Sequence, residues 1–172
     1  MIPALQTLPL LIFPLLVIAA ALRDVVSYTI PNWISLALVA GFAVAAVALR
    51  LPLPMLGIHL AIGVAALLAG MAMFAAGWIG GGDAKLFAAS ALWLGWPALV
   101  ADLALTGIAG GVLATALIGL RSPRLRPFLA QGPAWFIRLA QPGENVPYGL
   151  AIAVGALAAF PLSVLARAPG LA

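Results

Sequence analysis

The stretch that decides the fold is residues 55–78, MLGIHLAIGVAALLAGMAMFAAGW, which contains no Asp, Glu, Lys or Arg. An α-helix rises about 1.5 Å per residue, so a helix of this length exceeds the ~30 Å hydrocarbon core of a membrane. We therefore predict that this stretch crosses a membrane as a helix.

The composition of the whole chain agrees with this prediction. Of its 172 residues, 66% are hydrophobic and 7% are charged, and the mean hydropathy is +1.23. Soluble domains carry roughly 25% charged residues, so the composition excludes a water-soluble protein. No polar block is large enough to fold alone, which predicts a single membrane-embedded domain over residues 1–172. The chain has no cysteine, which excludes disulfides and cysteine-ligated zinc.

Further apolar runs lie on both sides of residues 55–78. We predict an all-α polytopic protein, a bundle of about six transmembrane helices, at about residues 8–22, 33–49, 55–78, 84–94, 97–120 and 148–166. The first run lacks a basic leader and a clear cleavage site, so we interpret it as a retained helix rather than a signal peptide. Gly95, Trp96 and Pro97 separate the fourth run from the fifth.

Basic residues predict the orientation. Six of the eight follow the first, third and fifth helices: Arg23, Lys85, Arg121, Arg124, Arg126 and Arg138. Basic loops face the cytoplasm, so the N-terminus is predicted to lie outside. These residues are scattered among hydrophobic runs, which argues against a nucleic-acid partner. The basic, aromatic stretch 121–147 is instead predicted to lie on the anionic membrane surface.

The chain contains four acidic residues, Asp24, Asp83, Asp102 and Glu144. A carboxylate near hydrocarbon is costly and therefore indicates a functional site. We expect Asp102 to be an ordinary interfacial acid near the opposite membrane face, and Glu144 to be a solvated loop residue. Asp24 and Asp83 are predicted to share the cytoplasmic side.

The sequence WIGGGDAKL, residues 78–86, surrounds Asp83 with unusual flexibility. Gly80, Gly81 and Gly82 can adopt positive φ and let an extended substrate backbone approach closely. The alternative is a glycine-rich turn in which Asp83 caps a helix. Asp24 is expected to close the first helix, and its alternative role is a salt bridge to Arg23 or Lys85.

Two carboxylates on one membrane face can form a catalytic pair. One ionised group accepts a proton from water while its protonated neighbour polarises a carbonyl group, which is the chemistry of peptide hydrolysis. We therefore predict that Asp24 and Asp83 share a proton and need no cofactor. The sole histidine, His59, is expected at the outer interface without metal-binding partners.

Glycine spacing predicts helix contacts. Small residues recur every fourth position at Gly107, Gly111, Thr115 and Gly119, and glycines recur every seventh position at residues 63, 70 and 77. Both patterns favour close packing of helix backbones.

Three segments resemble the type IV prepilin peptidases, membrane aspartic proteases with a GxGD motif. These are Asp24 with IPNW after it, GGGDAKL around Asp83, and VPYGLAIAVGAL from Val146. The resemblance implies that Asp24 and Asp83 are catalytic and that the substrate is a prepilin or pseudopilin. Cleavage of its leader is expected at the cytoplasmic edge of the bacterial inner membrane.

The chain lacks the cytoplasmic insertion and paired cysteines of larger members of that family. It looks more like the short peptidases associated with tight-adherence, or Flp, pili, which implies cleavage after a glycine and speaks against methyltransferase activity. Two other hypotheses stay open, a proton-coupled transporter and a non-catalytic membrane scaffold. A transporter predicts acids near the bilayer midplane and repeated halves, whereas a scaffold would tolerate replacement of both aspartates. The sequence does not indicate the oligomeric state.

Overall fold

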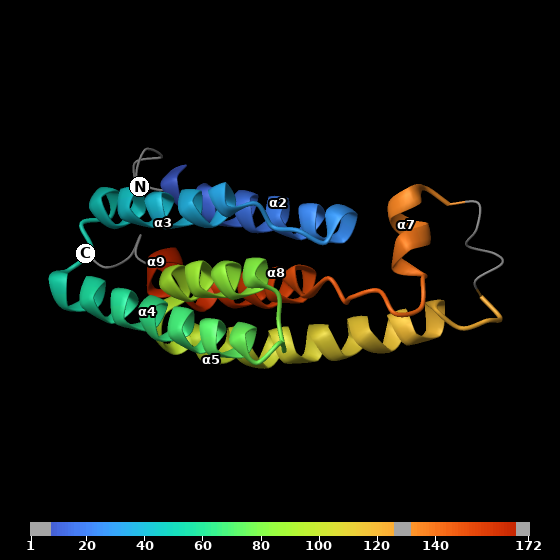
Figure 1. Ribbon diagram of the computed structural model, residues 1–172. Coiled ribbons are helices and arrows are strands. Elements are labelled where there is room, and N and C mark those ends of the chain that lie inside the picture. The colour runs from blue at the N-terminus through green and yellow to red at the C-terminus, as the bar shows by residue number, and fades with distance from the viewer. Residues whose placement is uncertain (1–7, 126–131, 168–172) are drawn as a thin grey trace.

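A computed structural model describes residues 8–125 and 132–167, and this part of the chain is helical, with turns and no strand. The all-α prediction is confirmed. In chain order the elements are η1 (Leu8–Leu11), α2 (Ile12–Ser27), α3 (Asn32–Ala48), α4 (Leu53–Ala75), α5 (Gly81–Leu120), α7 (Ala134–Leu139), α8 (Tyr148–Ala159), η2 (Phe160–Leu162) and α9 (Val164–Arg167) (Figure 1).

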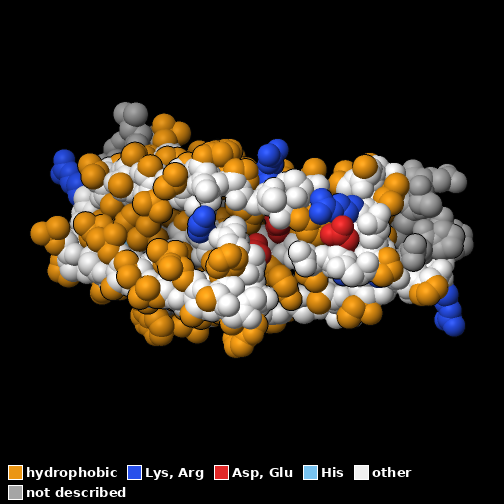
Figure 2. Space-filling model, in the orientation of Figure 1, with side chains coloured by type: hydrophobic (Ala, Val, Ile, Leu, Met, Phe, Trp, Pro, Cys, Tyr) orange, Lys and Arg blue, Asp and Glu red, His pale blue; other side chains and the backbone are white. Residues whose placement is uncertain are grey.

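The helices have the length and surface of membrane helices. Within the described residues, Leu8–Ser27, Leu53–Ala75 and Gly81–Leu120 are long and apolar enough to cross a bilayer, and Asn32–Ala48 and Tyr148–Leu162 are shorter apolar helices. Large hydrophobic side chains point outward, and hydrophobic atoms cover much of the face in Figure 2. A surface of this kind needs lipid rather than water around it. The protein is therefore a membrane protein.

The predicted break after the fourth helix is present inside α5. Gly95 has φ 61° and ψ −165°, and Trp96 has ψ 137°, neither of which is helical. The chain reverses direction at this point, so the two halves of α5 correspond to two of the predicted segments (Figure 1). With α2, α3, α4 and α8 they make up the six predicted apolar helices. The number of membrane crossings remains a prediction.

Helix α8 packs against both α2 and α5, which touch each other much less. A buried aromatic cluster supports this arrangement, because the Phe13 ring centroid lies 5.3 Å from that of Trp93 and 4.6 Å from that of Phe160. The indole Nε1 of Trp93 donates a hydrogen bond of 2.8 Å to the carbonyl oxygen of Leu38. These contacts fix α2, α3 and α5 around the end of α8, where η2 begins.

The glycine predictions are confirmed at Gly63 and Gly70, but wrong at Gly77, which lies beyond the end of α4 and has no neighbour within 4 Å of an added Cβ among the described residues, and wrong on α5. A Cβ placed on Gly63 would lie 3.1 Å from Leu92, and one on Gly70 would lie 3.1 Å from Ala84, so α4 packs closely on α5. By contrast, a Cβ on any member of the α5 series 107, 111 and 119 would meet nothing within 4 Å among the described residues. That face of α5 points outward.

Two polar residues lie deeper than predicted. Asp102 is fully buried, and its Oδ1 accepts a 3.1 Å hydrogen bond from Thr106 Oγ1. His59 is 2% exposed, and its Nδ1 lies 2.7 Å from the carbonyl oxygen of Leu92. Both residues are therefore covered by neighbouring helices, and their position near the outer membrane face remains a prediction. The position of a residue along its helix indicates its depth in the membrane, but helix packing decides whether other helices bury its side chain.

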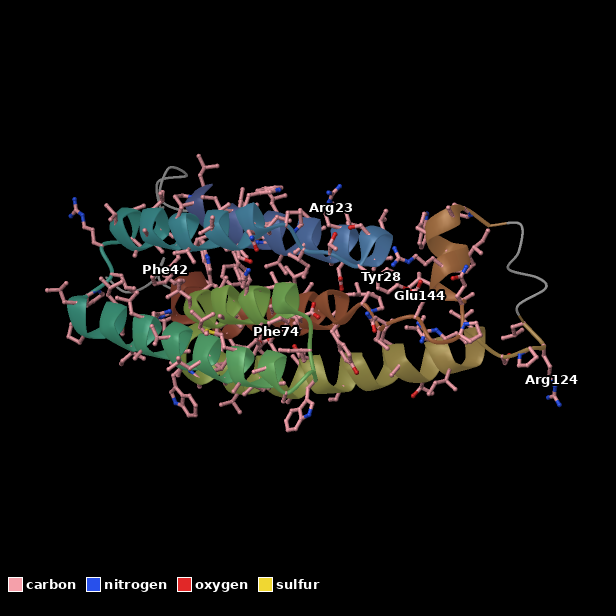
Figure 3. The ribbon with its side chains drawn as sticks, in the orientation of Figure 1. Arg23, Tyr28, Phe42, Phe74, Arg124 and Glu144 are labelled. Atoms are coloured by element: carbon pink, nitrogen blue, oxygen red, sulfur yellow. The ribbon has the colours of Figure 1, made fainter. Side chains whose placement is uncertain are left out.

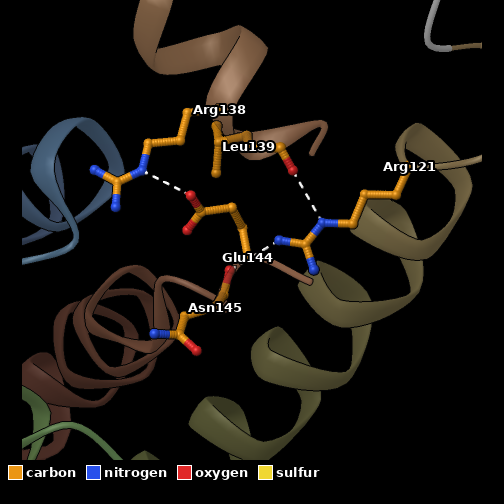
Figure 4. Close-up of polar contacts among 5 residues, drawn as sticks. All are labelled: Arg121, Arg138, Leu139, Glu144 and Asn145. Atoms are coloured by element: carbon orange, nitrogen blue, oxygen red, sulfur yellow. Dashed lines mark hydrogen bonds and ion pairs between the residues drawn. The ribbon is translucent and has the colours of Figure 1, made fainter. Parts of the chain in front are cut away.

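Residues 132–147, which we call the strap, fold back from α5 toward α2. Arg121 holds the strap by donating from Nε to the carbonyl oxygen of Leu139 at 3.0 Å and from Nη2 to that of Asn145 at 2.8 Å (Figure 4). Arg138 pairs with Glu144 at 3.1 Å, so Glu144 is an ion-pair partner rather than an isolated solvated acid.

The strap also contacts the end of α2. The Arg138 guanidinium lies 4.6 Å from the centre of the Tyr28 ring, and Figure 3 shows Tyr28 beside Glu144. Such a cation–aromatic contact favours a fixed position for the strap next to α2. Arg126, which the sequence places in a basic loop, lies outside the described residues.

Candidate active site

Asp24 lies in the last turn of α2 rather than after it. The helix continues to Ser27, and the left-handed Tyr28 (φ 53°) ends it by donating its N–H to the Asp24 carbonyl oxygen at 2.7 Å. The Asp24 side chain is buried, with 5% of the residue exposed. Within the described residues the one ion pair joins Arg138 and Glu144. The alternative salt bridge from Asp24 is therefore wrong.

Asp83 is the third residue of α5, and Gly80 is the residue that caps this helix. The Gly80 N–H donates to Asp83 Oδ2 at 3.3 Å, so the carboxyl group reaches back to a backbone amide before the first turn. This position is favourable for a negative charge, because the free amides of a helix start carry partial positive charge. Asp83 is 9% exposed.

The three glycines before Asp83 adopt ordinary backbone conformations. Gly80 is extended, at φ −71° and ψ 149°, Gly81 and Gly82 begin the helix, and none has positive φ. The close approach predicted for this segment is real at Gly82, where a Cβ would lie 3.1 Å from the Cβ of Ile30. The approaching chain is the protein's own α2–α3 loop. Substrate binding by these glycines remains a prediction.

The start of α8 joins the segments that carry the two aspartates. The Gly149 N–H donates to Asp24 Oδ2 at 2.7 Å. The Ile30 side chain packs against both Gly149 and Gly82, the residue before Asp83. The structure therefore brings together the segments that carry Asp24 and Asp83, which are far apart in sequence, and places the positive end of a helix beside each, α8 beside Asp24 and α5 beside Asp83.

Gly149 is a site residue that sequence reasoning did not single out. A Cβ at this position would lie 2.7 Å from both Asp24 Oδ2 and Ile30 Cδ1, so a side chain does not fit. One signal was available in the sequence: Gly149 follows Pro147 by two residues at the beginning of an apolar run. Proline is common where helices start. That signal marks a helix start but does not identify its partner.

The loop between α2 and α3 borders the pair on one side. The Ile30 side chain packs against both Gly82 and Gly149, and Lys85 Nζ donates to Asn32 Oδ1 at 2.8 Å. Asp24 and Asp83 keep small exposed fractions of 5% and 9%. Water can therefore reach an otherwise covered pair of carboxyl groups.

Such an arrangement suits hydrolysis. Two neighbouring carboxyl groups in a covered site hold one proton between them more easily than two negative charges, which gives one acid and one base. The described residues contain no group of three or more His, Cys, Asp or Glu side chains placed to hold a metal ion.

Comparison with known proteins agrees with this geometry. A protein-family model described as the type IV leader peptidase family matches residues 11–115, more than half of the chain. The chain belongs to the type IV leader peptidase family. It is thus a peptidase, a hydrolase of a family whose substrates are prepilin-type proteins in a membrane. No curated protein and no solved structure matches the chain.

The matched region of this type IV leader peptidase includes both Asp24 and Asp83 and ends within the second half of α5. Gly149 lies beyond it. The contact between the α8 amide and Asp24 is therefore an observation from the structure of this leader peptidase, independent of the family match.

Proposed function

We propose that this leader peptidase is an aspartic endopeptidase of the GxGD type whose catalytic residues are Asp24 and Asp83. The observation that carries the proposal is the position of Ile30, which packs against both Gly82, the residue before Asp83, and Gly149, whose N–H donates to Asp24 Oδ2 at 2.7 Å. This contact holds the start of α8 next to the start of α5, and general acid–base catalysis requires the carboxyl groups to be positioned in this way.

In the proposed reaction, a water molecule lies between the two carboxyl groups and the scissile carbonyl. The ionised aspartate accepts a proton from this water as its oxygen attacks the carbonyl carbon, and the protonated aspartate donates to the carbonyl oxygen. The first aspartate then passes its proton to the amide nitrogen as the C–N bond breaks, while the second takes a proton back from a hydroxyl group of the tetrahedral intermediate, which restores the pair. No cofactor enters these steps.

We propose a prepilin or pseudopilin of the Flp class as the substrate, cleaved at the cytoplasmic edge of the bacterial inner membrane. Basic residues support this orientation, because Arg23, Lys85 and Arg121 end or begin helices on the aspartate side of the bundle. We further propose that residues 1–172 form one peptidase domain without methyltransferase activity, and that Gly80–Gly82 border the substrate backbone.

The test is processing of a co-expressed Flp-type prepilin, followed by a gel shift. Asp24→Asn and Asp83→Asn each remove one acid–base group with little change in shape, and each is expected to lower cleavage at least about 100-fold. Asp102→Asn is the matched control. It replaces a third buried aspartate, whose packing lies elsewhere on α5, and it is expected to leave cleavage near the wild-type level.

Processing by both Asp24→Asn and Asp83→Asn would contradict the aspartic mechanism and favour a scaffold role for these residues. Loss of processing in Asp102→Asn, with the protein still present in the membrane, would show that the assay responds to any buried aspartate. Cleavage of other prepilins but not of Flp-type ones would keep the mechanism and change the substrate class.

A further inference from the structure

A groove of about 500 Å³ lies between α3, α4 and the first half of α5. Each helix contributes four residues with the spacing i, i+3, i+4, i+7, which is one continuous helix face. The three faces are Asn32, Ser35, Leu36 and Val39; Leu60, Gly63, Val64 and Leu67; and Lys85, Ala88, Ala89 and Leu92. Helices α3 and α4 form the walls and α5 forms the floor.

The groove is apolar along its body and positively charged at one end. Leu36, Val39 and Val64 are 69%, 48% and 57% exposed, so its walls are open to the surroundings. Lys85 and Asn32 meet at the polar end, where Nζ donates to Oδ1 at 2.8 Å. Within the described residues no carboxylate forms an ion pair with Lys85. This end therefore offers an ammonium group and a side-chain amide N–H to an anion.

The groove is separate from the aspartate pair. Lys85 follows Asp83 by two residues, and each residue turns an α-helix by about 100°, so the two side chains leave α5 in nearly opposite directions. The other floor residues, Ala88 and Leu92, share the Lys85 side. A peptide that lay along this floor would not present its backbone to Asp83.

The length of the groove distinguishes among occupants. Each wall and the floor extend over eight residues, for example from Asn32 to Val39, and the seven steps between them correspond to about 10 Å of helix. A transmembrane helix crosses ~30 Å of hydrocarbon, whereas half of that thickness is one leaflet. The length of the groove thus corresponds to part of the thickness of one leaflet, beginning at the polar surface of that leaflet.

We propose that this groove binds one anionic phospholipid, with an acyl chain along Leu36, Val64 and Leu92 and the phosphate at Lys85 and Asn32. Charge complementarity selects the occupant, because an anionic head group meets the ammonium group while the chain meets apolar walls. A hydrophobic peptide helix would leave Lys85 without an anion. The proposal does not depend on which residues catalyse hydrolysis.

The experiment is native mass spectrometry of the purified full chain with equal amounts of phosphatidylglycerol and phosphatidylcholine. Wild type is expected to retain phosphatidylglycerol preferentially. Lys85→Gln removes the charge and is expected to weaken that binding about fivefold, whereas Lys85→Arg restores it. The matched control is Arg23→Gln, since Arg23 is an exposed basic residue near the same end of the bundle that does not line the groove. Binding should not change in this control.

A second variant tests the apolar body. Val39→Trp fills the groove and is expected to displace the bound lipid, and a photoreactive residue at position 64 is expected to form an adduct with the mass of a phospholipid. Unchanged phosphatidylglycerol binding in Lys85→Gln, or an equal loss in Arg23→Gln, would overturn the proposal. An adduct with the mass of a polypeptide, whether a second copy or another protein, would also overturn it. Helix content by circular dichroism verifies that each variant is folded.

Discussion

Gly149 shows how one residue without a side chain determines the geometry of the aspartate pair. Gly149→Ala places a methyl group 2.7 Å from both Asp24 Oδ2 and Ile30 Cδ1, so the Asp24 carboxyl group must shift away from it, which disturbs the 2.7 Å hydrogen bond from the Gly149 N–H. Hydrogen bonds to charged groups contribute about 1.5–3 kcal/mol. We expect prepilin cleavage to fall at least about tenfold, measured as the rate of the gel shift.

The control for that variant is Gly111→Ala, because a Cβ on Gly111 meets nothing within 4 Å. Gly111→Ala is expected to cleave at the wild-type rate. Equal rates for Gly149→Ala and wild type would show that the α8 amide does not position Asp24 for catalysis.

The sequence predicts Asp24 and Asp83 because carboxylates are rare and costly in such an apolar chain. It does not predict their buried partners. Gly149 has no side chain, so its contribution through a backbone N–H leaves almost no trace in composition. The burial of Asp102 was not predicted either, because the position of a residue along its helix does not show that another helix, here α8, covers it.

At the scale of elements, helix α8 approaches two neighbouring helices closely at its glycines. Gly149 lies against α2, and Gly155 lies against α5. A Cβ on Gly155 would lie 2.7 Å from the backbone nitrogen of Thr106 and 2.9 Å from the carbonyl oxygen of Asp102. Backbone atoms cannot rotate away, so Gly155→Ala must separate α8 from α5. We expect a loss of about 1–3 kcal/mol in stability, measured by thermal unfolding in detergent.

Gly107→Ala is the matched control on α5, since a Cβ there meets no atom of the described residues within 4 Å. Its unfolding temperature should equal that of wild type. A lower value would mean that the outward face of α5 packs against something in the detergent-solubilised protein, such as a second copy.

Helix positions could be predicted from the sequence, but helix faces could not. Residue ranges from hydropathy and the break at Gly95 agree with the structure, because length and helix breakers are local properties. Lipid is as apolar as the protein core, so hydrophobic periodicity does not mark the packed side of a membrane helix. The spacing of glycines therefore identifies packed positions at Gly63 and Gly70, but it fails at residues 77, 107, 111 and 119.

At the scale of the whole molecule, the two ends of the bundle differ in charge. Arg23, Lys85 and Arg121 lie at the end that contains the aspartate pair, whereas Arg50 lies in the α3–α4 connection at the other end. The positive-inside rule predicts that the aspartate end faces the cytoplasm. This orientation would let a prepilin leader reach the pair before the pilin crosses the membrane.

Single introduced cysteines can test the orientation of the protein in the membrane. The chain has no cysteine of its own, so no other residue of the protein would be labelled by a maleimide. Leu53→Cys lies at the start of α4 and Leu125→Cys lies beyond the end of α5, and both leucines are exposed, at 81% and 45%. In intact cells a membrane-impermeant maleimide should label Leu53→Cys and not Leu125→Cys, and both should be labelled once the cells are opened. Labelling of Leu125→Cys in intact cells would place Asp24 and Asp83 outside the cytoplasm. The proposed site of leader cleavage would then be wrong even if both aspartates prove catalytic, because a leader that stays in the cytoplasm would not meet them.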